Sequence, residues 1–299
     1  MAKEIKFDKN GIILINKPEG VSSNKVVNIV KHTLSADKCG HLGTLDLEGA
    51  GLLPVTVNKG TKLFDWFLNK DKTYETIFVF GFETDTLDLS GTILKQDDKI
   101  VSRDEVEKAI KTMIGSYDQM PPMYSAKKVG GVVAYKSARK GESLNLSPKN
   151  ISIYDFKLLS QIDTNKFKFE ISCSSGTYIR SVCRDLAYKL STYGSMQCIL
   201  RTRCGNFYLK DASTLEEFEN GKFDFIECDN VFDFDKILLD DIQTEKILNG
   251  VDIKIEKENF ENKDENLKKN QKYKVYSQKQ FLGLGEIFDG KLRLTLRLV

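Results

Sequence analysis

The first regular pattern along the chain is a run of four aliphatic residues in the segment IILINKPEG, at 12–20. A short apolar run that ends at a Lys-Pro turn is typical of a buried strand. Beyond the turn, Val26, Val27 and Val30 share one face at helical spacing, and Ser23 is placed to cap the helix. The pattern predicts a strand, a turn and a helix.

Two longer segments carry aromatic and β-branched residues in the pattern of strands. TYETIFVFGF, at 73–82, has them on both faces, which is typical of a strand in the centre of a sheet. KFKFEISC, at 166–173, is the second segment, and the turn sequence SSG follows it.

Two helices are predicted around these strands. Ser102 and Glu105 form a capping-box pattern ahead of apolar residues at helical spacing, which are Val106, Ile110, Met113 and Ile114. After SSG, a second helix has a buried stripe made of Ile179, Val182, Cys183, Leu186 and Leu190. Arg180 and Arg184 are expected on the other side of this helix, and the strand and tight turn would deliver Arg180 to the end of the sheet.

The pattern changes in the last third of the chain. An acidic segment begins with a short capped helix, STLEEFENG, and a Lys/Glu-rich run then leads to QFLGLGEIFDGKLRLTLRLV, which reads as strands. Residues 1–235 are therefore expected to form one domain and 236–299 a small β domain. Within the first domain, two prolines and several glycines around a basic stretch predict an inserted segment at about 120–145.

Composition limits the class of protein. The chain has 299 residues, 40% of them apolar, which suffices for a large and a small core. It shows no basic start with a long apolar core and no apolar run that could span a bilayer, so a cytoplasmic protein without a membrane partner is expected. Six cysteines without a CxxC pair and only two histidines argue against disulfides and a zinc site.

The formal net charge of +2 hides a local concentration of basic residues. The stretch 121–141 contains no acid and five cations, which are Lys127, Lys128, Lys136, Arg139 and Lys140. A phosphate backbone responds to such a local patch more than to the net charge of the protein. A run of charged residues is, however, more often an ordinary solvated surface.

One carboxylate stands in an unusual setting. The segment GHLGTLDLEGAGLLP, at 40–54, places Asp46 between Leu45 and Leu47, five positions after His41. Acidic side chains usually lie where water can reach them, and a position between two leucines is an unlikely choice for a solvated turn. We therefore expect this acid to be withdrawn from solvent and to have a chemical role. Taken alone, a loop aspartate that caps a turn is the more common case.

Three motifs together resemble the TruB family, the tRNA pseudouridine-55 synthases: the Asp46 loop, DKTYE at 71–75 and GTYIRS at 176–181. The loop keeps the family's residues in register at His41, Gly43, Thr44, Leu45, Asp46, Gly51, Leu53 and Pro54. It departs at Leu42, where the family usually has Thr, at Leu47, where it usually has Pro, and at 48–50.

The resemblance extends over about residues 11–217. It includes NKPEGVSS at 16–23, GFETDTLDLSG at 81–91, QMPPMYSAKKVGGVVAYKSARKGE at 119–142 and LRTRCGNF at 200–207. It implies an α+β pseudouridine synthase fold with a largely antiparallel mixed sheet flanked by helices. The tail resembles, more weakly, a PUA RNA-binding domain at 236–299.

The resemblance implies that the protein isomerises a uridine in the tRNA T-loop, at position 55, to pseudouridine without cofactor or metal. Breaking the glycosidic bond develops positive character at the sugar, which calls for an ionised carboxylate, and Asp46 would supply it. Attack on C1′ and removal of a ribose proton to give a glycal both use this carboxylate, and the sequence leaves them open.

Two further residues would complete the catalytic group. An apolar loop would neutralise Asp46 unless a cation held it ionised, and arginine offers a planar fork to a carboxylate. Arg180 is the expected partner, and it matches the family's Asp-pairing arginine. Tyr74 matches the tyrosine that stacks on the flipped base; a phenol with a pKa near ~10 is a reluctant base, so stacking is its expected role.

Substrate-binding residues follow from the resemblance as well. Around the base and its neighbours they are His41, Gly43, Thr44, Tyr178 and Leu200, and toward the RNA backbone they are Lys17, Lys127 and Lys128. The expected partner is the T-arm stem-loop of tRNA, bound by a monomer. For His41 a purely structural role is a clear alternative.

Two other functions fit part of the pattern. The departures at Leu42, Leu47 and Glu48 are compatible with a tRNA-binding folding helper whose catalysis is secondary or lost. A glycosidase or a nucleoside enzyme would use Asp46 too, but the motifs offer no second carboxylate acid and such an enzyme leaves the basic stretch unexplained.

Overall fold

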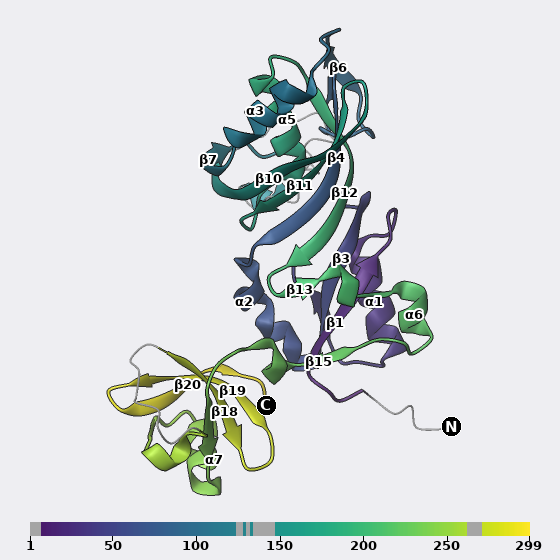
Figure 1. The fold of residues 1–299 in the computed structure, drawn as a ribbon. Helices are drawn as coiled ribbons and strands as arrows, with labels where there is room; N and C mark the ends of the chain where they lie inside the picture. Colours follow the sequence, from purple (N-terminus) through teal and green to yellow (C-terminus); the bar gives the residue numbers. More distant parts are fainter. Residues whose placement is uncertain (1–6, 124–127, 130–131, 134–146, 262–270) are drawn as a thin grey trace.

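The computed structural model describes residues 7–123, 128–129, 132–133, 147–261 and 271–299. Most of this chain is organised around one large sheet, and a smaller sheet lies near the C-terminus (Figure 1). The large sheet has the strand order β14 (Ser213–Thr214), β1 (Gly11–Lys17), β3 (Gly49–Val57), β12 (Gly194–Cys204), β4 (Lys72–Phe80), β11 (Lys166–Cys173), β10 (Lys149–Asp163) and β7 (Gly115–Gln119).

Most neighbours in this sheet are antiparallel. Two pairs are parallel, β1 with β14 and β3 with β12. Shorter strands extend it: β2 (Cys39–His41) pairs with β3, β13 (Phe207–Tyr208) with β12 and β15 (Phe225–Glu227) with β1. The expected largely antiparallel α+β architecture is confirmed, and β4 lies centrally between β12 and β11 as its two-faced pattern predicts.

Two helices cover one face of the sheet at the β7 end. They are α3 (Arg103–Lys111) and α5 (Ile179–Lys189), and their apolar residues pack on the phenylalanines of β4 and β11. The predicted capping box of Ser102 and Glu105 is present at the start of α3. The helix ends at Lys111, however, so Ile114 lies beyond it and is exposed.

At the other end of the sheet, β1 is buried on both faces. Ile13 and Ile15 pack on helix α1 (Ser23–Thr33) through its buried valines, which are Val26, Val27 and Val30. Ile12 and Leu14 pack on the opposite side. The cap of α1 is Ser22 and not Ser23, because the Ser23 hydroxyl, in the first turn, bonds elsewhere.

That opposite side joins the two sheets. Its core contains Phe67 of α2 (Phe64–Leu68), Phe232, and Leu284 and Leu298 from the C-terminal part. The smaller sheet has the order β16 (Lys236–Leu239), β18 (Lys272–Ser277), β19 (Phe281–Phe288), β20 (Lys291–Arg297) and β17 (Ile253–Lys254), with helix α7 (Asp241–Leu248) beside it. A small C-terminal β unit is thus present, as the strand-like sequence of the tail predicts.

The remaining elements are short. The predicted helix in STLEEFENG is α6 (Leu215–Glu219), with a capping box of Thr214 and Glu217. Among the described residues, two further strand pairs do not belong to either sheet: β5 (Phe82–Thr84) with β6 (Ile93–Gln96), and β8 (Lys128–Val129) with β9 (Val132–Val133). Most of the basic stretch lies outside the described residues. Within them, no helix is long and apolar enough to cross a membrane.

One glycine sets how closely β3 approaches β12. Gly51 has φ +99°, and a Cβ built on it would lie 2.5 Å from the carbonyl oxygen of Arg201 and 2.9 Å from its nitrogen. Both are backbone atoms of the paired strand, so they cannot rotate away. Only glycine fits here without moving the strand that also carries the Arg201 side chain.

We expect Gly51→Ala to lower the free energy of unfolding by about 2–5 kcal/mol, since it adds a backbone clash to the cost of a positive φ. Urea unfolding measures this. Gly221→Ala is the matched control: Gly221 also has a positive φ, but a Cβ added there would meet no atom within 4 Å, so its cost should stay at about 1 kcal/mol. Equal losses in the two variants would contradict the role of close approach.

Candidate active site

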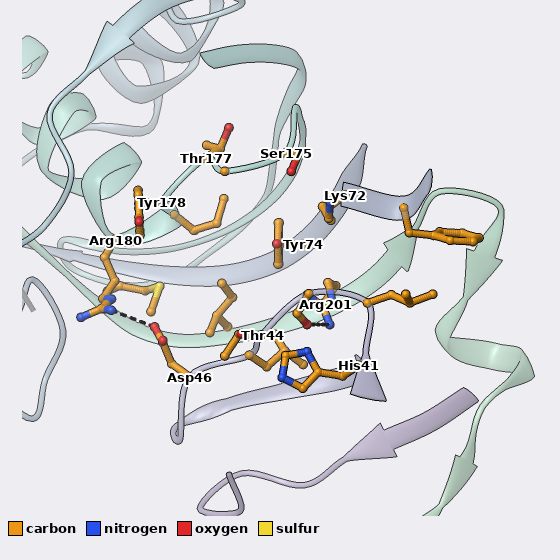
Figure 2. Close-up of a pocket in the computed structure, with 18 of the residues that line it drawn as sticks. His41, Thr44, Asp46, Lys72, Tyr74, Ser175, Thr177, Tyr178, Arg180 and Arg201 are labelled. Carbon is orange, nitrogen blue, oxygen red and sulfur yellow. Dashed lines mark hydrogen bonds and ion pairs between the residues drawn. The ribbon is translucent and has the colours of Figure 1, made fainter. Parts of the chain in front are cut away.

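A cavity of about 380 Å³ lies beside β12 and β4, the two neighbouring strands in the middle of the large sheet. Its walls come from the loop 41–46, from β4 and β12, from α2 and from the segment that enters α5. Figure 2 shows that side chains from these separate elements point toward one space. Segments far apart in the sequence therefore build one site.

Asp46 and Arg180 form an ion pair at this cavity. Arg180 Nη2 lies 2.8 Å from Asp46 Oδ2, with the two side chains facing each other across the cavity wall (Figure 2). The Asp46 side chain is 59% exposed and that of Arg180 only 10%. The expectation that Asp46 is withdrawn from water is therefore wrong: its leucine neighbours do not cover it, and it reaches solvent from the loop.

The helical stripe predicts Arg180 on the solvent side of α5. This prediction is wrong, because Arg180 is buried. It lies in the first turn, where the helix is packed on all sides, and its guanidinium is held by other groups besides Asp46. Nη1 donates to the Thr86 carbonyl at 3.0 Å and lies 3.4 Å from Asp88 Oδ2. Arg180 thus bridges two carboxylates, the exposed Asp46 and the largely buried Asp88.

Asp88 is a site residue that the sequence reasoning missed. Its Oδ1 accepts hydrogen bonds from the Thr86 and Ser90 hydroxyls, at 2.7 and 2.6 Å, while Oδ2 faces Arg180. The segment GFETDTLDLSG is part of the family resemblance, yet it contains two other acids within five residues of Asp88. Only the fold shows which of them faces the arginine.

The loop that carries Asp46 is held by buried side chains bonded to its main chain. The Ser23 hydroxyl accepts from the Leu45 nitrogen at 3.0 Å and donates to the Leu45 carbonyl at 2.8 Å. This is why Ser23 does not cap α1. The Leu47 carbonyl, on the other side of Asp46, also accepts a hydrogen bond from a buried side chain. The main chain is therefore fixed on both sides of Asp46.

Lys17 is one of those partners, and this corrects its predicted role. It is fully buried, and its ammonium donates to the carbonyls of Pro18, Val21 and Leu47, at 2.9, 2.6 and 3.3 Å. An ammonium with three carbonyl acceptors and no exposed surface cannot reach an RNA backbone. Burial also lowers the pKa of Lys17, opposed by the nearby carboxylates of Glu48 and Asp46.

The turn after Asp46 is stabilised without the proline that the family usually has. The Gly49 nitrogen donates to the Asp46 carbonyl at 3.1 Å, which closes a tight turn. The Gly20 nitrogen donates to the Leu47 carbonyl at 2.8 Å. The Leu47 side chain itself is 49% exposed, so backbone bonds define this turn.

Arg201 holds both ends of the loop. Its side chain is buried, Nε donates to the Leu52 carbonyl at 2.8 Å, and Nη2 donates to the Gly43 carbonyl at 3.0 Å. Figure 2 draws the latter bond beneath Tyr74. The prediction of Leu200 as a lining residue is wrong: side chains alternate along β12, so Ile199 and Arg201 line the cavity and Leu200 does not.

Tyr74 stands in the middle of the cavity wall, on β4. Burial raises the pKa of its phenol well above the ordinary value, and the positive charge of Arg201 beside it only partly opposes this shift. The phenol is therefore neutral near pH 7. This suits a flat packing surface better than a proton acceptor.

The other predicted residues fall into two groups. Gly43, Thr44 and Tyr178 line the cavity, as do His41 and the two partners of the ion pair. Tyr178 is fixed at the start of α5 by the Gln119 amide, which accepts from the Tyr178 nitrogen at 2.9 Å and donates to its carbonyl at 3.2 Å. Lys127 lies outside the described residues, and Lys128 is placed only as part of β8.

His41 is the one histidine at the site. Its Nδ1 is buried and has no hydrogen-bond partner among the described residues. Burial is the main cause that lowers the pKa of the imidazole, and the charge of Arg201 adds to it. The folded protein therefore favours neutral His41. In the described part of the chain, no three His, Cys, Asp or Glu side chains converge as metal ligands would.

This shift predicts a loss of stability on acidification. The folded protein binds a proton at His41 more weakly than the unfolded chain does, so stability decreases as the pH falls below about 6.5 toward the lower folded pKa. Thermal unfolding from pH 7.5 to 5 should show a smaller decrease for His41→Gln than for the wild type. His32→Gln, at the exposed second histidine, should follow the wild type. Parallel curves for all three proteins would refute the assignment.

Solved structures share this fold over nearly the whole chain. An H/ACA RNP bound to a substrate RNA containing 2′-deoxyuridine has a chain that matches with a TM-score of 0.68 at 18% identity, over 97% of this chain and 85% of that one. The archaeal box H/ACA sRNP Nop10-Cbf5 complex gives 0.67 at 19% identity, over 98% and 87%. At such low identity the likeness concerns the fold.

Sequence comparison specifies the class, which is that of the pseudouridine synthases. Residues 31–179 match the N-terminal domain of the TruB family pseudouridylate synthases, and 236–298 match the C-terminal part of pseudouridine synthase II TruB. The tRNA pseudouridine synthase B of Clostridioides difficile (strain 630) is 39% identical over 93% of this chain and 94% of its own. That of Clostridium perfringens (strain SM101 / Type A) is 34% identical over 97% and 99%. The chain belongs to the TruB family, which confirms the resemblance.

Proposed function

We propose that the protein converts uridine 55 in the T-loop of tRNA to pseudouridine, with Asp46 as the catalytic carboxylate. As a TruB family member the chain is a tRNA pseudouridine synthase, an isomerase. The observation that carries the proposal is the ion pair: an exposed carboxylate on a fixed loop, held at 2.8 Å by a buried arginine, at the edge of a cavity.

The reaction requires an anion close to the sugar of the target nucleotide. The bond between N1 and C1′ breaks, the base turns, and C5 bonds to C1′ and gives up its proton, while N1 gains one. Positive character at C1′ favours an ionised carboxylate nearby, as in glycoside hydrolysis. Asp46 meets this need whether it attacks C1′ or removes a ribose proton.

The exposure of Asp46 fits a substrate that brings its own cover. A uridine inside a folded T-arm must leave its stack to reach a protein side chain. Once the flipped nucleotide occupies the cavity, it would displace water from Asp46 and strengthen the local electrostatics. Arg180 prepares the carboxylate for this step, because Asp88 and the Thr86 carbonyl fix the guanidinium before substrate arrives.

Tyr74 is proposed as the platform for the flipped base. It lies on the wall between the ion pair and Lys72, and its neutral phenol presents an apolar ring. His41, Gly43, Thr44 and Tyr178 surround it and are proposed to contact the base and its neighbouring nucleotides. Lys17 and Leu200 have no part in substrate contact, because Lys17 is buried and Leu200 does not line the cavity.

Residues 1–235 would form the catalytic domain, with Lys127 and Lys128 in a basic segment that meets the RNA backbone, and residues 236–299 would form a further RNA-binding unit. The protein is proposed to act as a monomer in the cytoplasm, on the T-arm stem-loop, without cofactor or metal.

Asp46→Asn should abolish the reaction and leave binding nearly intact, because the amide keeps the shape of the side chain but not its charge. We expect tritium release from a T-arm stem-loop containing 5-tritiated uridine to fall by about 10³-fold or more, with Kd changed by less than about 3-fold. Glu48→Gln removes a charge at another exposed position of the same loop and should retain activity. Equal release from wild type and Asp46→Asn would leave a binding or folding helper as the better description.

Arg180→Lys should lose far more rate than affinity. An ammonium keeps the charge, but it cannot bond Asp46, Asp88 and the Thr86 carbonyl in one plane. We expect the single-turnover rate at saturating RNA to fall by about 10²-fold and Kd to change by less than about 5-fold. Arg184→Lys is the matched control, since Arg184 lies one turn further along α5 and away from the cavity. Comparable losses of rate and affinity in Arg180→Lys would indicate an RNA-binding role.

A further inference from the structure

The cavity contains two buried cations that the mechanism above does not use. Lys72 on β4 and Arg201 on β12 both line it, and their exposed fractions are 7% and 1%. Arg180, by comparison, has carboxylates on two sides. Among the described residues, neither Lys72 nor Arg201 has a carboxylate within ion-pair distance. One wall of the site thus carries uncompensated positive charge.

The Arg201 guanidinium already donates to the carbonyls of Leu52 and Gly43, whereas Lys72 has N–H groups that remain available. Among the described residues, the Lys72 ammonium makes one hydrogen bond, to the Lys70 carbonyl at 2.5 Å, which leaves two of its three N–H groups for a ligand. Burial lowers the pKa of Lys72 and the charge of Arg201 adds to this effect. A cation in such a position is costly for the free protein, and an anion that enters the cavity would relieve the cost.

The position of Lys72 indicates which anion that is. Lys72 and Tyr74 are two residues apart on β4, so both face the cavity, and Tyr74 separates Lys72 from the ion pair (Figure 2). Two residues of strand span about 7 Å, so Lys72 lies beyond the ring on which the base would stack. The anionic group of an RNA chain beside a flipped base is the phosphodiester that connects it to its neighbour.

We propose that Lys72 is a substrate-binding residue that takes a backbone phosphate next to the flipped uridine. The inference rests on the proposed function, since it assumes RNA in the cavity. A lysine suits the task because its ammonium acts as a point charge toward phosphate. The neighbouring Lys70 is not equivalent: its ammonium lies 4.8 Å from the centre of the Trp66 ring.

The first test is binding of the T-arm stem-loop to Lys72→Met. Loss of one phosphate contact should weaken binding by about 10-fold at low salt and make the slope of log K against log salt shallower by about 0.7–0.9. Lys157→Met is the matched control: Lys157 is exposed, pairs with Asp155 and Glu170, and does not line the cavity. Wild-type affinity and slope in Lys72→Met would overturn the proposal.

Thermal unfolding without RNA separates this role from a structural one. Methionine has an apolar side chain of similar length. Removing a buried ammonium that has no carboxylate partner among the described residues should therefore leave the stability unchanged or raise it. A clear drop in stability together with unchanged RNA affinity would assign Lys72 to the fold. Lys72→Gln provides a second variant that keeps a polar end, and it should show the same loss of affinity.

A substrate series locates the contact. Stem-loops in which a neutral methylphosphonate replaces one phosphate at a time, on either side of the target uridine, are bound to wild type and to Lys72→Met. One substitution should weaken binding to the wild type by about 10-fold and binding to the variant by less than about 2-fold. Equal effects on both proteins at every position would refute the subsite.

The same series keeps the two proposals distinct. If the wild type releases no tritium from the unmodified stem-loop but shows the methylphosphonate pattern, the site of modification is wrong and the phosphate contact stands. If it releases tritium without the pattern, the reaction stands and the role of Lys72 is wrong.

Discussion

The site depends on one arrangement: main-chain carbonyls of the loop 43–52 are bonded by polar side chains that are themselves buried. Arg201, Ser23 and Lys17 come from β12, α1 and β1, and each ends on a different part of the loop. Buried donors of this kind are costly unless they are satisfied, so the loop and the core stabilise one another. An acid can therefore be exposed to water and still have a fixed direction.

The electrostatics follow from this arrangement. In the part of the chain that the structure describes, four cations face the loop or the cavity, and they differ in what compensates their charge. Lys17 and Arg201 have carbonyls, Arg180 has two carboxylates, and Lys72 has a single carbonyl. The acid is held on one side of Tyr74 and the least compensated cation lies on the other. A nucleotide has a matching polarity, because the sugar carbon that becomes positive and the anionic phosphate are separate groups of one unit.

Much of the fold could be predicted from local patterns, because β4, α3 and α6 are specified by residues within a few positions of one another. The motif residues of the site, including Asp46 and Arg180, could be selected too. The environment of each of these residues could not be predicted from the sequence. The leucine neighbours of Asp46 predict a buried acid, and the family resemblance predicts Lys17 at the RNA backbone. In the structure, Asp46 reaches solvent from its loop, and Lys17 is enclosed by three carbonyls. The sequence does not single out Asp88, and it predicts Leu200 at the cavity where Ile199 and Arg201 lie. In both cases the direction in which a side chain faces depends on distant contacts, which a single sequence does not give.

The loop bonds also bear on how this enzyme could diverge. The bonds that Lys17 and the Gly20 nitrogen make to the Leu47 carbonyl are bonds to a peptide group, so they do not depend on the side chain at that position. Substitution of the exposed residues Leu47 and Glu48 can therefore change the chemistry of the turn without changing its path, whereas Asp46 is also held by its side chain and Gly51 has no room for one. Leu47, which stands out into solvent where a proline is usual, is the visible sign of this freedom. A turn that is held by its peptide groups leaves the exposed positions after its acid open to variation.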